Sequence, residues 1–374
     1  MWTLAVKNLV HDRVRLAITL IGITFSVVLI LIQVGMFFGM TANSSTVIEN
    51  SEGDLWIMAR NSQNFDMVNP FPESLVTAAR SVPGVEWAEN LIQQFAFMRL
   101  ENGGTEQIEV IGFDLNGKVG RPWNVIAGDW NALRGTDGIF VDETAFNRLG
   151  TVQIGEFREI VEKKVRVVGI TRGIMSFTTA PYIFTSYESA QRMVPQQLAG
   201  KTTYIVVKVA DGAAIEGVKR ELERRLKSYD VRTSREWAKK TRNYWTWQTG
   251  IGAGFFGNAL MGFIVGLVIV SQTIYSATME HIREYGTLKA IGAKNFDVYS
   301  VILQQAGVSA VSGFLLAIII QRVLLAIKPM TLQIAAPPAL YVGTFLLTLA
   351  MCGLAALISV RRVATIDPVE VFKG

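Results

Sequence analysis

The sequence predicts a membrane protein of four transmembrane α-helices, with a large α+β extracytoplasmic domain inserted between helices 1 and 2. Half of the 374 residues are hydrophobic and only 18% are charged, whereas a soluble domain carries about 25% charged residues. Four stretches are apolar over the roughly 20 residues that a helix needs to cross a bilayer. Between the first two stretches, short alternating runs and turn residues are typical of strands.

The four predicted spans cover residues 14–40, 251–279, 298–320 and 338–360. The first is longer than the roughly 7 to 15 apolar residues of a signal peptide, and bulky Phe37 and Phe38 replace the small residues of a cleavage site. We therefore interpret it as a retained span. No span carries an acidic or basic residue in its interior, which argues against a transporter driven by an ion gradient.

The flanking positive charges predict the orientation, because Lys and Arg concentrate in short cytoplasmic segments. They lie mainly in residues 1–13, 280–297 and 361–374, whereas the 321–337 loop holds only Arg322 and Lys328. Both termini are therefore expected in the cytoplasm, and the 321–337 loop and residues 41–250 on the outer side.

The outer segment, residues 41–250, is large enough to fold as a domain. We expect a base from about 46–113 and 202–235, with a lobe from about 114–201 inserted into it. Tyr244, Trp245 and Trp247 suit the membrane interface, and from Arg235 one helix is expected to continue into the membrane. The predicted strands are 53–59, 95–100, 107–113, 138–141, 164–170, 182–185 and 203–209, and the predicted helices are 72–81, 142–149, 186–194 and 213–228.

The residues that carry catalysis or metal binding in other proteins are scarce. Cys352 is the single cysteine, so neither a disulfide within the chain nor a thiolate cluster can form. His11 and His281 lack a second histidine or a carboxylate partner in the sequence pattern. Residues 199–202 mimic the end of a phosphate-binding loop, but Pro195 replaces its first glycine. We therefore predict no catalytic residue, no metal site, no cofactor in this chain and no nucleic-acid partner.

Glycines recur with four-residue spacing at the start of the second span. This spacing lets two helix backbones approach closely, within one chain or across a dimer. The predicted packing residues are Gly250, Gly254, Gly262 and Gly266.

The most informative segment is residues 280–293, between the second and third spans. Charged residues give way to apolar Leu288 and Ile291, and Gly292 allows a turn. A short amphipathic helix of this kind docks into a groove of a soluble protein. The alternative is a helix that rests on the membrane surface.

The run REYGTLKAIGA, residues 283–293, resembles the REIGxLKAIGA signature of MacB/FtsX-type ABC transporter permeases. Residues 5–23 are similar to the amphipathic helix and first span of that family, and residues 361–372 to its closing R-x-x-P-x-E-x-L/F. The layout of one span, a large outer domain and three further spans is also similar. The absence of a fused ATPase domain departs from MacB itself, and the size and layout look closer to the DevC type of permease, which works with a separate ATPase. His281 and Tyr285 differ from the residues that usually occupy these positions of the motif.

The resemblance implies a permease subunit of an ATP-binding cassette exporter in the bacterial inner membrane. A separate ATPase subunit would bind ATP and Mg²⁺ and dock on residues 280–297. The other implied partners are a second permease copy, a periplasmic adaptor, an outer-membrane tunnel and membrane lipids. The expected coupling residues are Glu280, Arg283, Glu284, Gly286, Leu288, Lys289 and Gly292.

Three functions remain open for a chain of this kind. The first is export of a hydrophobic or amphiphilic compound through the adaptor and tunnel. The second is extraction of a lipoprotein or heme from the outer leaflet. The third is FtsX-like signalling to a cell-wall hydrolase.

Overall fold

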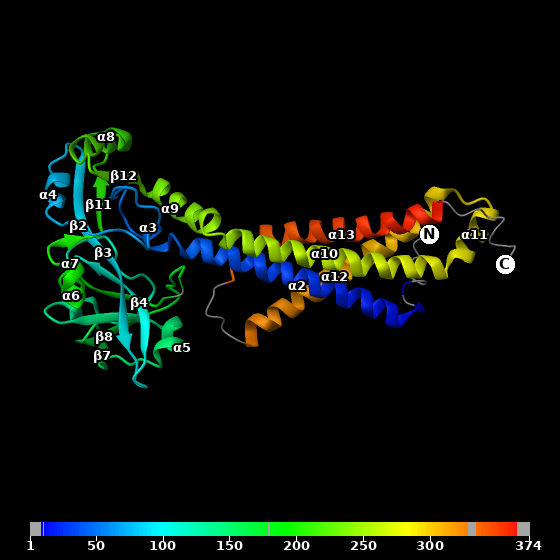
Figure 1. Ribbon diagram of the computed structural model, residues 1–374, viewed down its shortest axis with the longest axis horizontal. Coiled ribbons are helices and arrows are strands. Elements are labelled where there is room, and N and C mark those ends of the chain that lie inside the picture. Colours follow the sequence, from blue (N-terminus) through cyan, green and yellow to red (C-terminus); the bar gives the residue numbers. More distant parts are fainter. Residues whose placement is uncertain (1–8, 10, 179, 328–333, 365–374) are drawn as a thin grey trace. The chain divides into compact units, whose positions relative to one another are not determined.

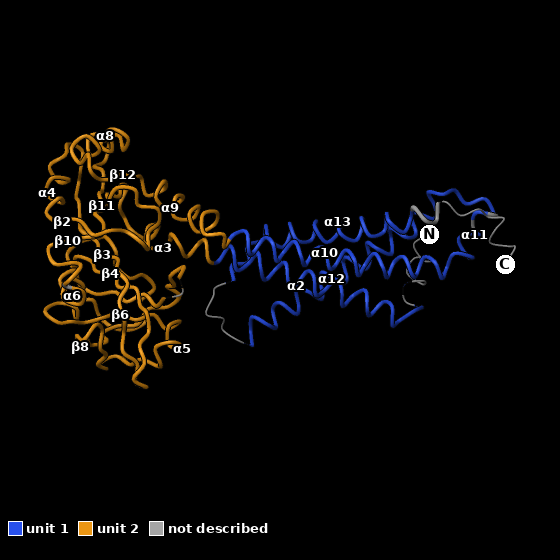
Figure 2. The backbone as a smooth tube through the Cα atoms, viewed as in Figure 1, with its two compact units in different colours: residues 1–39, 252–374 blue, residues 40–251 orange. Residues whose placement is uncertain are grey.

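The structure, a computed structural model, describes residues 9, 11–178, 180–327 and 334–364. They form two compact units, shown in different colours in Figure 2. The helical unit comprises residues 1–39 and 252–374, and the inserted domain comprises residues 40–251. The predicted closing motif at 361–372 lies largely outside the described residues, as do most of the expected 1–13 helix and part of the 321–337 loop.

The helical unit contains four helices that are long and apolar enough to cross a membrane. With the large α/β domain between the first and second helices, they confirm the predicted fold class. The third helix continues past the predicted end of its span at residue 320. The four are α2 (Arg13–Asn43), α10 (Ile251–Glu280), α12 (Asn295–Ile327) and α13 (Pro338–Ala364), drawn in Figure 1.

One apolar core joins these helices, and small residues let them approach closely. A Cβ atom at Gly22 of α2 would lie 2.5 Å from a side-chain carbon of Ile269 in α10, and one at Gly313 of α12 would lie 2.5 Å from Ile23. Because apolar chains gain little from burial inside lipid, such close contacts carry much of the packing energy in a membrane. The core includes Ile23, Val27, Leu31, Val270, Val298, Val301, Ile302, Ala306, Ala310, Ala317, Met351, Cys352, Ala355 and Ala356.

The inserted domain alternates strands with short helices. Its strands are β1 (Leu55–Ala59), β2 (Phe71–Pro72), β3 (Val85–Arg99), β4 (Thr105–Phe113), β5 (Val125–Gly128), β6 (Gly138–Asp142), β7 (Phe157–Ile160), β8 (Lys163–Thr171), β9 (Tyr182–Ser186), β10 (Lys201–Thr202), β11 (Tyr204–Val209) and β12 (Tyr229–Thr233). Its α-helices are α3 (Thr46–Glu49), α4 (Leu75–Arg80), α5 (Phe146–Leu149), α6 (Tyr187–Met193), α7 (Pro195–Leu198), α8 (Ile215–Arg225) and α9 (Ser234–Asn243).

A sheet in the order β12-β1-β11-β3-β4-β9-β6-β8-β5 organises the domain, and β7 pairs with both β3 and β8. Val76 of α4 and Val218 and Leu222 of α8 pack with Ile57 and Ile205 from the β12-β1-β11-β3 part. The 15-residue strand β3 continues from this part into the rest of the sheet.

Six strands, including β3, form a closed barrel. The pairings β3–β4, β4–β9, β9–β6, β6–β8, β8–β7 and β7–β3 form a complete circuit, which removes exposed strand edges. Ile92, Ile108, Val141, Val165 and Ile183 belong to its buried core. Strands β3 and β4 of the expected base thus pair with strands of the expected lobe 114–201 in one barrel.

The chain does not run from Arg235 into the membrane as one helix, as the sequence analysis expected. Helix α9 begins with a capping box between Thr233 and Glu236 and ends at Asn243. A π-helical turn, η3 (Tyr244–Gln248), follows. Gly250 then has φ +75°, a backbone conformation that interrupts a helix, and α10 begins at Ile251. The expected continuous helix is interrupted at this point.

The burial of Trp245 differs from the expectation that its side chain lies at the membrane interface. It is only 7% exposed, and its indole N–H donates a 2.9 Å hydrogen bond to Asp66 inside the inserted domain. The N–H of this indole is satisfied by a buried carboxylate and its ring packs on an aromatic neighbour, so lipid headgroups are not required as a polar partner. Trp247, in contrast, is 68% exposed and suits an interfacial position.

Candidate functional site

The segment with the sequence signature folds as helix α11 (Ile282–Ala290), immediately after the end of α10. The helical hydrogen-bonding pattern passes from α10 into α11 through His281. Its amide donates to the carbonyl of Ala277 at 3.2 Å, and its carbonyl accepts from the amide of Tyr285 at 3.1 Å. Gly292 ends the segment with φ +107°. An L-residue with a side chain is strained there, so this turn explains why a glycine follows Ile291.

Helix α11 is attached to the helical unit through Tyr285. This side chain is 1% exposed and belongs to the same core as Val298 and Ile302 of α12. Gly286 is also buried. The departure from the usual motif at Tyr285 therefore supplies an aromatic anchor that fixes one face of the short helix.

The other face of this segment is open. Arg283, Glu284 and Thr287 are exposed, and Lys289 is half-buried. Ile291 is 81% exposed and Phe296, just beyond the turn, is 76% exposed. Large apolar side chains at a charged rim are typical of a binding surface. We call Arg283, Glu284, Ile291 and Phe296 the docking face. The side chain of Leu288 lies outside the described residues.

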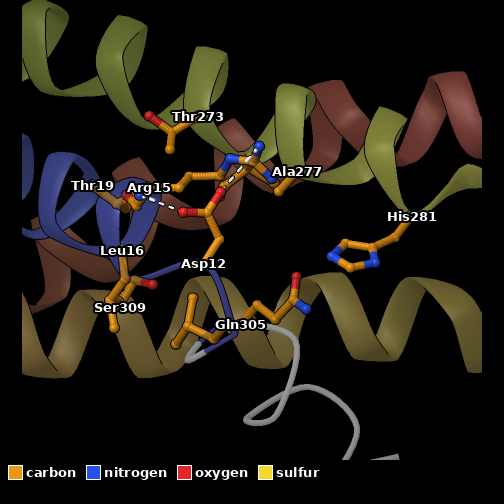
Figure 3. A pocket seen from close by; sticks show the side chains of 11 residues that line it. Asp12, Arg15, Leu16, Thr19, Thr273, Ala277, His281, Gln305 and Ser309 are labelled. Carbon is orange, nitrogen blue, oxygen red and sulfur yellow. Dashed lines mark hydrogen bonds and ion pairs between the residues drawn. The ribbon is translucent and has the colours of Figure 1, made fainter.

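Glu280 connects the end of α10 to the beginning of α2. Its carboxylate accepts a hydrogen bond from the guanidinium of Arg15, which also lies 3.3 Å from a carboxylate oxygen of Asp12. Figure 3 shows Arg15 and Asp12 beside α10. The Glu280 side chain is 60% exposed, and an exposed pair of this kind contributes roughly 0 to 1 kcal/mol. The contact therefore fixes the end of α10 beside the start of α2 and adds little to the stability of the fold.

A small cavity opens beside this ion pair, between α2, α10 and α12 (Figure 3). Its volume of about 30 Å³ accommodates one or two water molecules. A hydrophobic substrate is far too large for it, so the cavity belongs to a joint between helices. Its lining residues are Leu9, Asp12, Arg15, Leu16, Thr19, Thr273, Ile274, Ala277, His281, Gln305 and Ser309.

His281 has a carboxylate partner that the sequence analysis did not expect. Its Nδ1 atom lies 3.0 Å from Oε1 of Glu284, three residues later. The i,i+3 spacing on a helical turn brings the two together, and this spacing was the signal available in the sequence. Among the described residues no group of three metal-ligating side chains lies within reach of one ion.

The four predicted packing glycines fall into two pairs. A Cβ atom at Gly262 would lie 2.5 Å from Leu29, and one at Gly266 would lie 2.6 Å from both Ser26 and Met351. These two glycines permit contact within the chain. Gly254, and Gly250 before the helix, have no described atom within 4 Å of such a Cβ, so packing against another copy remains a prediction for them.

The fold and this site define a multi-pass membrane protein with an inserted α/β domain. Between its second and third spans lies a short helix with one buried and one exposed face. Residues 16–225 match the MacB-like periplasmic core domain, and residues 256–368 match the FtsX-like permease C-terminal domain. Because the first match alone covers more than half of the sequence, the chain belongs to the MacB/FtsX-type ABC transporter permeases.

Relatives along the whole chain agree with this family. An ABC transporter permease of Methanocaldococcus jannaschii is 22% identical over 399 residues, covering 100% of this chain and 97% of that protein. An ABC transporter permease of Mycobacterium tuberculosis is 22% identical over 374 residues, with 99% of each chain covered. A Staphylococcus haemolyticus protein, named as a hemin transport system permease protein, HrtB, is 27% identical over 112 residues, which is 30% of this chain and 32% of that protein.

Among solved structures, the periplasmic region of MacB from Actinobacillus actinomycetemcomitans is similar to this chain. The match covers 53% of this chain and 98% of the MacB structure. The TM-score is 0.39 and the sequence identity is 11%.

Proposed function

We propose that this chain is the permease subunit of an ATP-binding cassette exporter and that a separate ATPase subunit docks on α11. The observation that supports this most is the two-sided character of α11. Tyr285 fixes one face of α11 in the helical core, while Arg283 and Glu284 are exposed. Two exposed apolar side chains, Ile291 and Phe296, follow beyond the end of α11. Relatives named as ABC transporter permeases imply an ATPase partner.

The proposed transmission follows from how α11 is held. Closure of two ATPase subunits on ATP would push on the docking face. Tyr285 would pass this displacement to α12, and Glu280 with Arg15 would pass it to α2. A short helix with a buried anchor moves with its neighbours as a unit, because a packed core transmits strain. The connection between α11 and its neighbouring helices would then depend on Glu280, Gly286, Lys289 and Gly292. The partner ATPase would bind ATP and Mg²⁺.

In this proposal α11 and both termini lie in the cytoplasm of a bacterial inner membrane. The excess of Lys and Arg on that side supports this orientation. The inserted domain would then lie in the periplasm. There it would act with a periplasmic adaptor and an outer-membrane tunnel to expel a hydrophobic or amphiphilic substrate. A second permease copy would complete the assembly.

A second candidate is extraction of a ligand such as heme from the membrane, and the partial likeness to HrtB favours it. An apolar groove of about 410 Å³ is lined by Leu20, Phe25 and Leu316, among other residues. Its α2 residues belong to the half of that helix nearer α11, but Leu316 belongs to the half of α12 farther from α11, so the groove favours neither leaflet. Both candidates use the same docking face.

Replacing Arg283 and Glu284 together by alanine is expected to weaken co-purification of the ATPase subunit that accompanies the wild-type chain. Exposed charges at an interface contribute about 0.2 to 1 kcal/mol each, so the expected loss of affinity is roughly twofold to thirtyfold. The measurement is a pull-down from solubilised membranes with titrated ATPase, together with the amount of permease inserted in the membrane.

The matched control is Arg220→Ala with Glu223→Ala on α8, which removes the same two charges from exposed positions of the inserted domain. This control should co-purify like the wild type. Unchanged co-purification and ATPase activity in the Arg283→Ala and Glu284→Ala variant would count against docking at α11.

A further inference from the structure

Two carboxyl groups are buried against each other inside the inserted domain. Asp66, in the loop after β1, is 3% exposed, and Glu109 of β4 is fully buried. Within the part of the chain that the structure describes, neither forms an ion pair with Lys, Arg or His. Two ionised carboxylates in contact without a cation are strongly unfavourable away from water. The geometry therefore calls for a proton between them.

The hydrogen bonds around the pair leave a place for that proton. Glu109 accepts hydrogen bonds from Nε2 of Gln93 and from the hydroxyl of Ser176, each at 2.7 Å. Oδ2 of Asp66 accepts from Trp245 at 2.9 Å. Oδ1 of Asp66 is buried and receives no hydrogen from a described N–H or hydroxyl group. Nε2 of Gln93, which donates to Glu109, also donates to the backbone carbonyl of Asp66 at 3.1 Å and so holds the two residues together. A proton on Glu109 supplies the missing donor.

The surroundings favour the protonated form. Burial raises the pKa of Glu109 well above its ordinary value, and the adjacent Asp66 raises it further. Burial also raises the pKa of Asp66. The other titratable groups that face the pair are the phenols of Tyr182 in β9 and Tyr204 in β11. Burial raises the pKa of both phenols, so they stay neutral, and β3, the loop after β8 and η3 contribute uncharged groups.

The same cluster holds the segment that leads to the second span. Trp245 lies in η3, and its ring stacks on Phe177 with centroids 4.2 Å apart. Phe177 follows Ser176, the residue that donates to Glu109. The hydroxyl of Thr249, just before Gly250, donates to the carbonyl of Trp245 at 2.7 Å. The carboxyl pair thus joins two loops and the strands β3 and β4 to the turn that precedes α10.

We propose that Asp66 and Glu109 form a binding site for a single proton, and that its occupancy fastens Trp245 and the 244–248 turn to the core of the inserted domain. We call Asp66, Glu109 and Trp245 the proton latch. Loss of the proton places two negative charges in a dry site, and separation of the loops that carry them relieves the repulsion. The latch concerns the inserted domain alone and does not depend on where the ATPase docks.

The sign of the pH effect follows from linkage. In the unfolded chain the two carboxyls regain pKa values of about 4, so between that pH and the raised folded-state pKa values the folded domain holds more protons than the unfolded chain. The latch is therefore most stable in acid. It weakens as the pH rises above about 4 through the folded-state pKa values, by up to about tenfold in its equilibrium constant for each pH unit and each proton retained. The two groups titrate as one coupled pair.

The test uses hydrogen–deuterium exchange of the full chain in lipid nanodiscs, with protection factors corrected for the intrinsic effect of pH. From about pH 5 to about pH 8, protection of residues 244–248 should fall at least about tenfold in the wild type. In Glu109→Gln the amide donates permanently to Asp66, so protection should stay constant. Asp66→Asn gives an independent second variant should the first fail to fold. The control Glu159→Gln, at a 41% exposed side chain of β7, should keep the wild-type dependence.

Infrared difference spectra of the same samples provide a direct readout. A band from a protonated carboxyl group should be present in the wild type near neutral pH, absent from Glu109→Gln and present in Glu159→Gln. Protection that does not change with pH in the wild type would overturn the proposal. So would a pH dependence that persists in both latch variants, or a spectrum without the carboxyl band that Glu109→Gln should remove.

Discussion

Replacing Ile291 and Phe296 by aspartate should abolish recovery of the ATPase subunit with this permease. Both side chains are more than three-quarters exposed, so the substitutions remove no packing from the permease itself. Burying one large apolar side chain at an interface contributes about 1.5 to 3 kcal/mol, and two together correspond to a loss of roughly a hundredfold or more in affinity. This exceeds the loss expected for Arg283 and Glu284.

The measurement is a binding titration of ATPase to solubilised permease, with membrane insertion followed in parallel. The inserted domain offers a matched control in Ile154→Asp with Phe157→Asp, at positions that are 47% and 55% exposed. This control should bind like the wild type. If the Ile291 and Phe296 variant keeps its ATPase but leaves the membrane fraction, then α11 rests on lipid and the docking face is misassigned.

Gly266→Leu should destabilise the helical unit. A Cβ atom at this position would lie 2.6 Å from Oγ of Ser26 and 2.6 Å from Sδ of Met351, so α2 and α13 must both move away from α10. Overpacking of this kind costs about 1 to 3 kcal/mol, and a whole leucine lies at the upper end. The expected result is a loss of monodisperse protein in detergent and a clear fall in Tm.

Gly254→Leu is the matched control, in the same helix and with the same substitution. No described atom lies within 4 Å of a Cβ at this glycine, so the Tm of the helical unit should stay near the wild-type value. The mass of the purified complex then tests the predicted dimer, since a leucine at a close contact between copies would shift it to a monomer. An equal fall in Tm for both variants would contradict the difference between the two glycine pairs.

The spans could be predicted because length and apolar composition alone define them. The short helix after the second span could be predicted from its charge pattern and its resemblance to a family signature, and its docking on an ATPase stays a prediction. Phe296 was missed because it lies beyond the glycine turn and outside the signature. The anchoring role of Tyr285 was missed because a burial contact with α12 depends on how helices pack, and the sequence pattern of a short helix does not contain it.

The inserted domain was less predictable because its pairings are non-local. Strand β3 begins at Val85, ten residues before the predicted strand, since Glu86, Glu89 and Asn90 conceal the alternation. The closing pair between β7 and β3 joins segments about 60 residues apart and leaves no local signal. Likewise, Asp66, Glu109 and Trp245 meet only after the domain folds, and their types alone predict exposed loops or an interfacial tryptophan.

The central claim is that α11 faces the cytoplasm and receives the ATPase. It is tested most directly by Ile291→Cys in a chain whose single cysteine is replaced, Cys352→Ala. A membrane-impermeant maleimide should label this residue in inverted membrane vesicles but not in intact spheroplasts, and bound ATPase should block the label. Labelling in intact spheroplasts, or labelling that ATPase leaves unchanged, would contradict the account.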